Sequence, residues 1–283
     1  MKKVVVTGGS GRLGQLVIEE LFSQDYQVLS LDRLRPAVTL CPSWIADLRS
    51  SGDVYEALVG AYAVLHLGAY QAPGLAPDAE VFSNNVTATY NVLKAAGDLG
   101  VKKAVIASST AAFGFIYALK GILPEYLPLD EKHPSRPQDS YGLSKLVGEQ
   151  IADSLALLYA DMTISSLRFP GVVFDRSYES VRERWKDPGA RAKTSWAYID
   201  ARDAANACRL AIEAEFNGHE IMIVAAPTSS MREPTVELIG KYLDKGIPVK
   251  TPLTGNWSGV NSAKAEKILK FKAQYGWENS LTI

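Results

Sequence analysis

A tyrosine and a lysine stand four residues apart in the stretch Tyr-Gly-Leu-Ser-Lys, as Tyr141 and Lys145, and together they could move a proton. Residues four positions apart lie on one face of a helix, so the phenol and the ammonium would face the same way. A free phenol has a pKa of about 10, and a nearby positive charge favours the phenolate and lowers that pKa. The phenol would then take a proton from a substrate hydroxyl near neutral pH. Taken alone, the spacing equally fits an exposed tyrosine and a solvated lysine.

A hydroxyl-rich stretch lies upstream at 105–114 and reads Val-Ile-Ala-Ser-Ser-Thr-Ala-Ala-Phe-Gly. Its beginning is typical of a strand, so the hydroxyls would lie at the carboxyl end of that strand. A hydroxyl at this place would orient the oxygen of a substrate alcohol or carbonyl. The alternative is that these side chains only satisfy the backbone of a turn.

The third feature is the glycine stretch Thr-Gly-Gly-Ser-Gly-Arg-Leu-Gly at 7–14. Gly8 would allow a tight turn, Gly11 would let the backbone approach a diphosphate, and Gly14 would let a helix pack closely on the sheet. The helix that follows would offer free N–H groups and its positive dipole end to the phosphates. The stretch therefore predicts a dinucleotide site.

Asp32 ends the next strand-like run, 18 residues after Gly14. An acid at this distance is placed to hydrogen-bond the ribose hydroxyls of the cofactor. A carboxylate repels a 2′-phosphate, which favours NAD over NADP. Arg33 and Arg35 follow directly and would attract such a phosphate, so NADP remains an alternative.

The elements that would position these residues alternate between strands and helices. We interpret apolar runs as strands at 3–7, 26–32, 63–67, 103–108, 162–169 and 220–225. Apolar residues at helical spacing predict helices at 13–22, 85–99 and 144–159. Runs that are apolar on both faces suit parallel strands that are covered on both sides. We therefore predict an α/β fold, a Rossmann-type doubly wound parallel sheet.

The pattern changes after about residue 170, which predicts two parts. Residues 1–170 would form an NAD-binding Rossmann domain. Residues 171–283 would form a mixed, substrate-binding part, from which about 195–226 return to the Rossmann sheet. Within it, 176–194 looks irregular or short-helical, and 234–243 and 262–269 look helical. This part would pack over the carboxyl edge of the strands, where ligands bind in such sheets.

Composition excludes several other classes of protein. With 30 Lys+Arg and 31 Asp+Glu the formal net charge is -1, so we expect neither nucleic-acid nor membrane binding. A basic cluster from Arg182 to Lys193 reads as a solvated loop. Cys41 and Cys208 have no metal-ligand spacing, so we expect no metal and two reduced thiols. No signal peptide or membrane-spanning run is evident, and we expect a cytoplasmic protein.

These motifs resemble the extended short-chain dehydrogenase/reductase family, also called the NAD-dependent epimerase/dehydratase family. The resemblance rests on the glycine stretch, the acid after the second strand, Asp47-Leu48, "VLHLGA", "NNVTATYNVL", "SSTAAFG", "YGLSK" and "LRFPGVV", which occur in family order. It implies that Ser109, Tyr141 and Lys145 are the catalytic residues. His66, within the third of these strands, we interpret as structural.

The resemblance also implies a set of cofactor contacts. Asp47 and Leu48 match the residues at the adenine, 67–69 match the loop along the diphosphate, Asn84 and Asn85 match a helix start, and Pro170 faces the nicotinamide. The full set is Gly8, Gly11, Arg12, Leu13, Gly14, Asp32, Arg33, Asp47, Leu48, Leu67, Gly68, Ala69, Asn84, Tyr141, Lys145 and Pro170. Homodimers are common in the family, and Leu146, Ile151, Leu155 and Leu158 would serve such an interface or the core.

Departures from the family pattern bear on the substrate. Gly171 stands where nucleotide-sugar epimerases usually carry an asparagine that contacts the substrate diphosphate, and the segment up to Tyr198 is short. The stretch 194–196 is similar to compact hexuronate dehydrogenases. We predict an oxidoreductase that transfers hydride to or from an alcohol carbon of a sugar, uronic acid or polyol. Arg168, Arg176, Arg182 or Arg184 would hold a carboxylate.

Two other functions remain open at this point. A nucleotide-sugar epimerase with tightly bound NAD would use the same Ser109, Tyr141 and Lys145, so these residues do not separate it from a dehydrogenase. A non-catalytic NAD(P) sensor is the third alternative. Such relatives tend to have lost the tyrosine or the lysine, and this chain keeps both.

Overall fold

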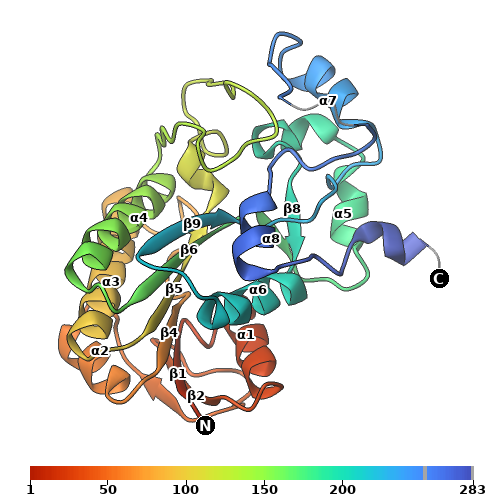
Figure 1. Cartoon of the computed structure of the whole chain (residues 1–283). Coiled ribbons are helices and arrows are strands. Elements are labelled where there is room, and N and C mark those ends of the chain that lie inside the picture. Colours follow the sequence, from red (N-terminus) through yellow and green to blue (C-terminus); the bar gives the residue numbers. More distant parts are fainter. Residues whose placement is uncertain (251–253, 282–283) are drawn as a thin grey trace.

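The computed structural model describes residues 1–250 and 254–281, and at its centre lies a sheet of seven parallel strands (Figure 1). In spatial order the strands are β3 (Ser43–Ile45), β2 (Gln27–Asp32), β1 (Lys3–Thr7), β4 (Ala63–His66), β5 (Lys103–Ser109), β6 (Thr163–Phe169) and β9 (His219–Ile223). The chain changes its direction across the sheet between β1 and β4, and a crevice forms at such a point. The predicted doubly wound α/β fold is confirmed.

Helices cover both faces of this sheet (Figure 1). They are α1 (Arg12–Phe22) and α6 (Ala201–Glu213) on one face, and α2 (Ser51–Leu58), α3 (Asp78–Asp98) and α4 (Ser140–Leu158) on the other. Successive side chains of β1 enter different cores, because Val4 and Val6 pack with α1 and α6 whereas Val5 packs with α2, α3 and α4. This two-sided burial explains why the strands read as continuous apolar runs.

Helices α3 and α4 begin earlier than their apolar periodicity predicts. Helix α3 begins at Asp78 rather than at 85, and α4 begins at Ser140 rather than at 144. The first turn of α3 is acidic rather than apolar, which suits the positive end of the helix dipole. Asp139 caps α4 by accepting the backbone N–H of Gly142 at 2.7 Å. Tyr141 therefore lies in the first turn of α4.

The remaining elements lie beyond the carboxyl ends of the strands, apart from α8, which packs against α6 and β9. They are the 3-10 turn η1 (Thr110–Phe113), β7 (Gly171–Val173), α5 (Glu179–Arg184), η2 (Pro188–Thr194), β8 (Tyr198–Asp200), α7 (Thr235–Tyr242), α8 (Ala263–Leu269) and η3 (Trp277–Leu281). Strand β8 pairs with β7 in a separate two-stranded sheet, whereas β9 joins the main sheet. The segment 195–226 thus contributes to both sheets.

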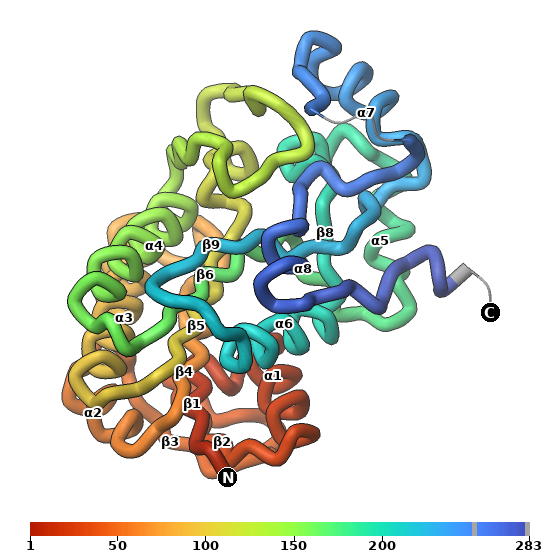
Figure 2. Tube along the Cα trace, in the orientation of Figure 1, coloured from red at the N-terminus to blue at the C-terminus, as the bar shows by residue number. Residues whose placement is uncertain are grey.

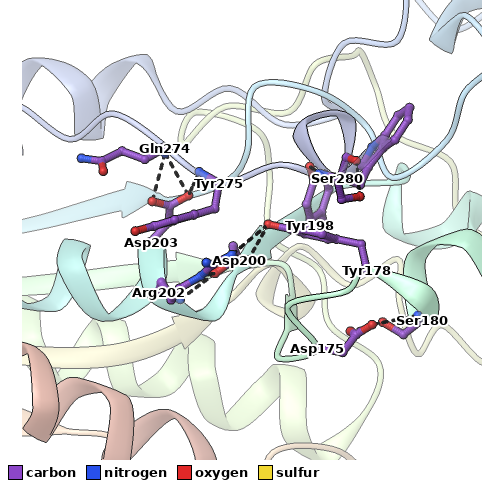
Figure 3. Close-up of polar contacts among 11 residues, drawn as sticks. Asp175, Tyr178, Ser180, Tyr198, Asp200, Arg202, Asp203, Gln274, Tyr275 and Ser280 are labelled. Carbon is purple, nitrogen blue, oxygen red and sulfur yellow. Dashed lines mark hydrogen bonds and ion pairs between the residues drawn. The ribbon is translucent and has the colours of Figure 1, made fainter. Parts of the chain in front are cut away.

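Segments far apart in the sequence lie side by side in this part (Figure 2). The backbone N–H groups of Gln274 and Tyr275 donate to the carboxylate of Asp203 in α6, each at 3.0 Å. The guanidinium of Arg202 lies 3.6 Å from the ring centroid of Tyr275. Figure 3 shows that this network continues through Asp200, which accepts a hydrogen bond from the hydroxyl of Tyr178 beside α5. The C-terminal segment and α5 are therefore both anchored to α6.

Candidate active site

A cavity of about 800 Å³ lies at the carboxyl ends of the central strands. Loops after β1, β2, β4 and β5 form one wall, and β7, α5 and η2 contribute to the other. Fifteen of the sixteen residues predicted from the sequence as cofactor contacts line it, together with Ser109. They are Gly8, Gly11, Arg12, Leu13, Asp32, Arg33, Asp47, Leu48, Leu67, Gly68, Ala69, Asn84, Tyr141, Lys145 and Pro170.

The glycine stretch forms a turn that has no room for a side chain at Gly8 or at Gly14. Gly8 has φ 71°, and a Cβ on it would lie 2.6 Å from the backbone nitrogen of Gly68. Gly14 does not line the cavity, because a Cβ there would lie 2.2 Å from the carbonyl oxygen of Gly8. A Cβ on Gly11 would meet only that same oxygen, at 3.2 Å, and Gly11 faces the cavity. The exposed backbone of this turn is a cradle that fits a diphosphate at the start of α1.

Asp32 lies at the end of β2, next to this turn. Its carboxylate accepts the backbone N–H groups of Ser10 at 3.0 Å and Leu34 at 3.1 Å. These two bonds fix the orientation of the carboxylate and leave it further acceptor positions, as a ribose contact requires. The guanidinium of Arg33 lies 5.3 Å from the ring centroid of Tyr70.

Asp47 and Leu48 line the cavity beyond Asp32. Asp47 forms an ion pair with Arg49 at 2.7 Å, and Leu48 is buried. A Cβ on Gly68 would lie 2.6 Å from the Cδ1 of Leu48, so Gly68 makes room for this leucine.

Asn84 and Asn85 lie inside α3, not at a helix start as the family resemblance implied, because α3 begins at Asp78. The side chain of Asn84 faces the cavity and donates to Asn85 at 3.1 Å. The side chain of Asn85 instead accepts the backbone N–H of Tyr70 and donates to the carbonyl oxygen of Tyr70 and to the hydroxyl of Ser144. Asn85 thus ties the loop after β4 to α4.

Ser109, Tyr141 and Lys145 meet at the other end of the cavity. The hydroxyl of Ser109 hydrogen-bonds the phenol of Tyr141, which is 8% exposed. The ammonium of Lys145 donates to the carbonyl oxygen of Ala107 at 2.7 Å and lies 5.6 Å from the ring centroid of Tyr141. Side chains from β5 and from the first two turns of α4 are thereby brought to one point.

The electrostatics of this group differ from the expectation drawn from the sequence. Burial raises the pKa of Tyr141 to about 12, and the hydrogen bond from Ser109 only partly opposes this increase. Burial also lowers the pKa of Lys145 to about 8, against the nearby charge of Glu149. The phenol pKa is therefore raised and not lowered as expected, because burial of the phenol is the dominant effect.

Of the four arginines considered for a substrate carboxylate, one lines the cavity. Arg168 is buried in an ion pair with Glu149 at 2.7 Å, and Arg176 is exposed. Arg182 points to the hydroxyl of Ser280 at 3.4 Å. Arg184, at the end of α5, faces the cavity.

The interpretation of 182–193 as a solvated loop is wrong for Arg184 and Arg191, which are both half-buried in the cavity wall. Lys193 lines the cavity at its rim, and its ammonium donates to the carbonyl oxygen of Ala118 at 3.2 Å. Sequence reasoning missed Arg191 and also Tyr117, whose ring packs edge-on against that of Tyr141 at 6.1 Å between centroids. No local pattern marks either residue, because only the return of the chain over the sheet places them here.

His66 is buried away from the cavity lining. Its Nδ1 lies 2.7 Å from the hydroxyl of Thr7, and its Nε2 lies 3.2 Å from that of Thr89. Burial, and to a lesser degree the charge of Lys145, lowers the pKa of His66 to about 3. A neutral imidazole that joins β1, β4 and α3 agrees with a structural role.

Within residues 1–250 and 254–281, no three His, Cys, Asp or Glu side chains gather as a metal site would require. Both cysteines of the chain are buried free thiols. No helix in the described ranges is long and apolar enough to span a membrane.

Comparisons with known proteins show which family the chain resembles in sequence and in fold. Residues 4–184 match the NAD dependent epimerase/dehydratase family. The chain is 30% identical over 224 residues to an L-arabinose 1-dehydrogenase (NAD(P)(+)) of Haloferax volcanii, which covers 76% of this chain and 84% of that protein. It is 31% identical over 159 residues to an NAD-dependent glucose-6-phosphate dehydrogenase of the same organism, which covers 52% of this chain and 60% of that protein.

The fold also occurs among solved structures. A UDP-glucose 4-epimerase from Brucella ovis in complex with NAD superimposes with a TM-score of 0.75. The superposition covers 99% of this chain and 96% of the epimerase at 21% sequence identity. At this identity the likeness concerns the fold.

Proposed function

This chain belongs to the NAD-dependent epimerase/dehydratase family, and we propose that it is an NAD-dependent dehydrogenase that transfers hydride to or from an alcohol carbon of a sugar-like substrate. One observation carries the proposal. A single cavity holds the glycine turn and Asp32 at one end and the group Ser109, Tyr141 and Lys145 at the other. The first set fits a dinucleotide, and the second fits proton transfer at a hydroxyl.

Ser109, Tyr141 and Lys145 have different roles in the oxidation of an alcohol. Tyr141 accepts the hydroxyl proton while the carbon becomes a carbonyl and loses hydride. Ser109 holds the reacting oxygen and stabilises the charge that develops on it. Lys145 supplies a positive charge beside the phenol, which favours the phenolate. The nicotinamide of bound NAD supplies the hydride acceptor or donor.

The remaining predicted contacts would hold the cofactor. We assign the diphosphate to the turn with Gly8 and Gly11, and the adenosine ribose to Asp32. The side chains at 47–48 would contact the adenine, and Pro170 would lie against the nicotinamide. The carboxylate of Asp32 supports NAD over NADP, although Arg33 lies next to it.

The residues in the cavity wall favour a small substrate, and so a dehydrogenase rather than a nucleotide-sugar epimerase. A Cβ on Gly171 would lie 3.3 Å from the Nη2 of Arg191, so this guanidinium occupies the space next to the start of β7. Gly171 itself offers no side chain that could contact a substrate diphosphate. The similarity to an arabinose dehydrogenase over three quarters of the chain supports the same choice.

The test measures NADH formation at 340 nm with a panel of sugars, uronic acids, sugar phosphates and polyols. Wild-type protein is compared with Tyr141→Phe and with Tyr90→Phe, which changes an exposed tyrosine outside the cavity. We expect Tyr141→Phe to lower kcat by about 10²- to 10⁴-fold with NAD affinity retained, because general acid-base catalysis contributes this much. The control should keep full activity.

Two outcomes would contradict the proposal. Equal turnover by wild-type protein and Tyr141→Phe would remove the phenol from the reaction. No net NADH with any substrate, together with conversion of a nucleotide sugar seen by chromatography, would assign the cavity to an epimerase.

A further inference from the structure

Arg184 and Arg191 are two cations in the cavity wall without a protein partner. Neither guanidinium forms a hydrogen bond or an ion pair with a described residue. The Nη1 of Arg184 and the Nε of Arg191 are buried atoms without any hydrogen-bond acceptor. Leaving a buried donor unsatisfied is costly, and the cost is greater for a charged group. An oxyanion in the cavity would supply the acceptors and the negative charge that these two groups lack.

The positive charges of Arg184 and Arg191 are not neutralised by a neighbouring carboxylate of the described residues. Burial, and next the charge of Arg191, lowers the pKa of Arg184 to about 10. Asp175 lies near enough to attract Arg184, but its oxygens accept the backbone N–H and the hydroxyl of Ser180. The carboxylates that line the cavity, Asp32 and Asp47, lie at its adenosine end.

The pair lies close to the proposed reaction centre. Arg191 is close enough to Tyr117 for its charge to oppose the rise that burial causes in the pKa of Tyr117. The ring of Tyr117 in turn contacts the ring of Tyr141. An anion held by Arg191 would thus lie about one side chain away from the phenol that handles the proton. That separation suits a small substrate whose reacting carbon and charged group belong to the same sugar.

We propose that Arg184 and Arg191 together bind a phosphate monoester on the substrate, so that the dehydrogenase acts on a sugar phosphate. This proposal rests on the proposed function for the reaction and on the two guanidinium groups for the phosphate. A phosphate monoester carries close to two negative charges and three acceptor oxygens, enough to pair with both groups. A carboxylate carries one negative charge, which would leave one partly desolvated guanidinium uncompensated.

The first experiment measures phosphate binding without turnover. Inorganic phosphate is titrated by calorimetry into NAD-saturated wild-type protein and into Arg184→Gln, Arg191→Gln and Lys186→Gln. Lys186 lies between the two arginines in sequence but is exposed and outside the cavity. We expect each arginine variant to bind about 10- to 100-fold more weakly, as loss of a charge-assisted pair predicts, and Lys186→Gln to bind like wild type. Melting temperatures show that each variant is folded, and Arg→Lys variants at both sites should recover part of the affinity.

The second experiment compares kcat/KM for one sugar with and without a phosphate group and for its uronic acid. We expect the phosphorylated sugar to be preferred by about 10- to 100-fold, and each Arg→Gln variant to lose that preference mainly through KM. Preference for the uronic acid, or equal phosphate binding by wild type and both arginine variants, would overturn the phosphate site. Phosphate binding that depends on both arginines without any NADH formation would keep the site and refute the proposed dehydrogenase. Efficient oxidation of neutral sugars without such binding would support the dehydrogenase and refute the phosphate site.

Discussion

Tyr141 shows how its surroundings, rather than its type alone, set the chemistry of a residue. The phenol is buried and burial raises its pKa to about 12, so it is protonated at neutral pH. In that form it can donate a proton to a carbonyl oxygen that accepts hydride. In the oxidative direction it must first become a phenolate, which requires a positive charge brought close to it. The ammonium of Lys145 lies 5.6 Å from the centroid of the phenol ring and is the positive charge of the protein placed for this role.

Asp32 should decide the choice of cofactor at the residue scale. Replacing it in Asp32→Ser removes the negative charge that repels a 2′-phosphate and the acceptor for the ribose hydroxyls. We expect kcat/KM with NAD to fall by about 10- to 100-fold and the ratio of NADP to NAD efficiency to rise, since hydrogen bonds to charged groups contribute about 1.5–3 kcal/mol. The matched control is Asp25→Asn, which changes an exposed acid in the turn before β2. An unchanged cofactor ratio in Asp32→Ser would contradict the assignment.

His66 should make the stability of the protein depend on pH. Its folded-state pKa is about 3, below the ordinary value of about 6.5, so below pH 6.5 the unfolded chain binds one more proton than the folded chain. The free energy of unfolding should therefore fall by up to about 1.4 kcal/mol per pH unit as the pH decreases from 6.5. Urea unfolding at several pH values measures this slope in wild type and in His66→Gln. A smaller slope in the variant is expected, whereas parallel curves, even if offset, would contradict it.

At the scale of elements, the position of α1 depends on close backbone packing. Helix α1 approaches the turn after β1 at Gly14, and the same contact aims the start of the helix at the cavity. Gly171 performs a similar task in β7, where the missing side chain leaves space for the guanidinium of Arg191. At both glycines the absence of a Cβ allows a close contact, of α1 with the turn after β1 and of β7 with Arg191.

Gly14→Ala tests the packing of α1. The new Cβ would lie 2.2 Å from the carbonyl oxygen of Gly8, so the helix or the turn must shift. We expect the free energy of unfolding to fall by about 1–3 kcal/mol, as overpacking does elsewhere, and NAD affinity to fall with it. Gly52→Ala in α2 is the control, because a Cβ there meets nothing within 4 Å. Equal effects of the two substitutions would show that the contact is not important.

At the scale of the whole molecule, the C-terminal segment around 274–275 and helix α5 of the cavity wall are both hydrogen-bonded to the beginning of α6, which packs on the Rossmann sheet. Asp203 of α6 holds the backbone of 274–275, and Asp200 at the start of the same helix holds Tyr178 beside α5 (Figure 3). Because α5 carries Arg184, the position of the proposed phosphate site depends on the contact of Tyr178 with Asp200 and on that of Arg182 with Ser280, 98 residues away in the chain.

Asp203→Ala should loosen this attachment. Two backbone N–H groups would lose their acceptor in a half-buried place, and we expect the free energy of unfolding to fall by about 1–3 kcal/mol. Thermal and urea unfolding measure this change, with Glu19→Ala on the exposed side of α1 as the control. Equal stability of the two variants would show that Asp203 does not anchor the C-terminal segment.

The homodimer expected from the family resemblance stays a prediction. Of the four apolar residues in α4 that would serve a homodimer interface or the core, Leu155 is buried, whereas Leu158 is 64% exposed. Leu155 thus belongs to the core beneath the helix.

The sequence by itself determined the features that depend on neighbouring residues. Apolar runs predicted six of the seven strands of the main sheet and missed the short edge strand β3. The spacing of Gly8, Gly11 and Gly14 predicted the turn between β1 and α1, and four-residue spacing placed Tyr141 and Lys145 on one helical face. Such patterns are readable because the period of a helix or strand and the conformational demands of a tight turn act over a few residues.

Only the tertiary structure decided how distant segments meet. It brought Ser109 to Tyr141, buried Arg168 against Glu149, and turned Arg184 and Arg191 from an apparent solvated loop into a cavity wall. The burial that it imposes on Tyr141 also raises the pKa of the phenol. Burial and the proximity of charges depend on the path of the whole chain, and no local period in the sequence records that path.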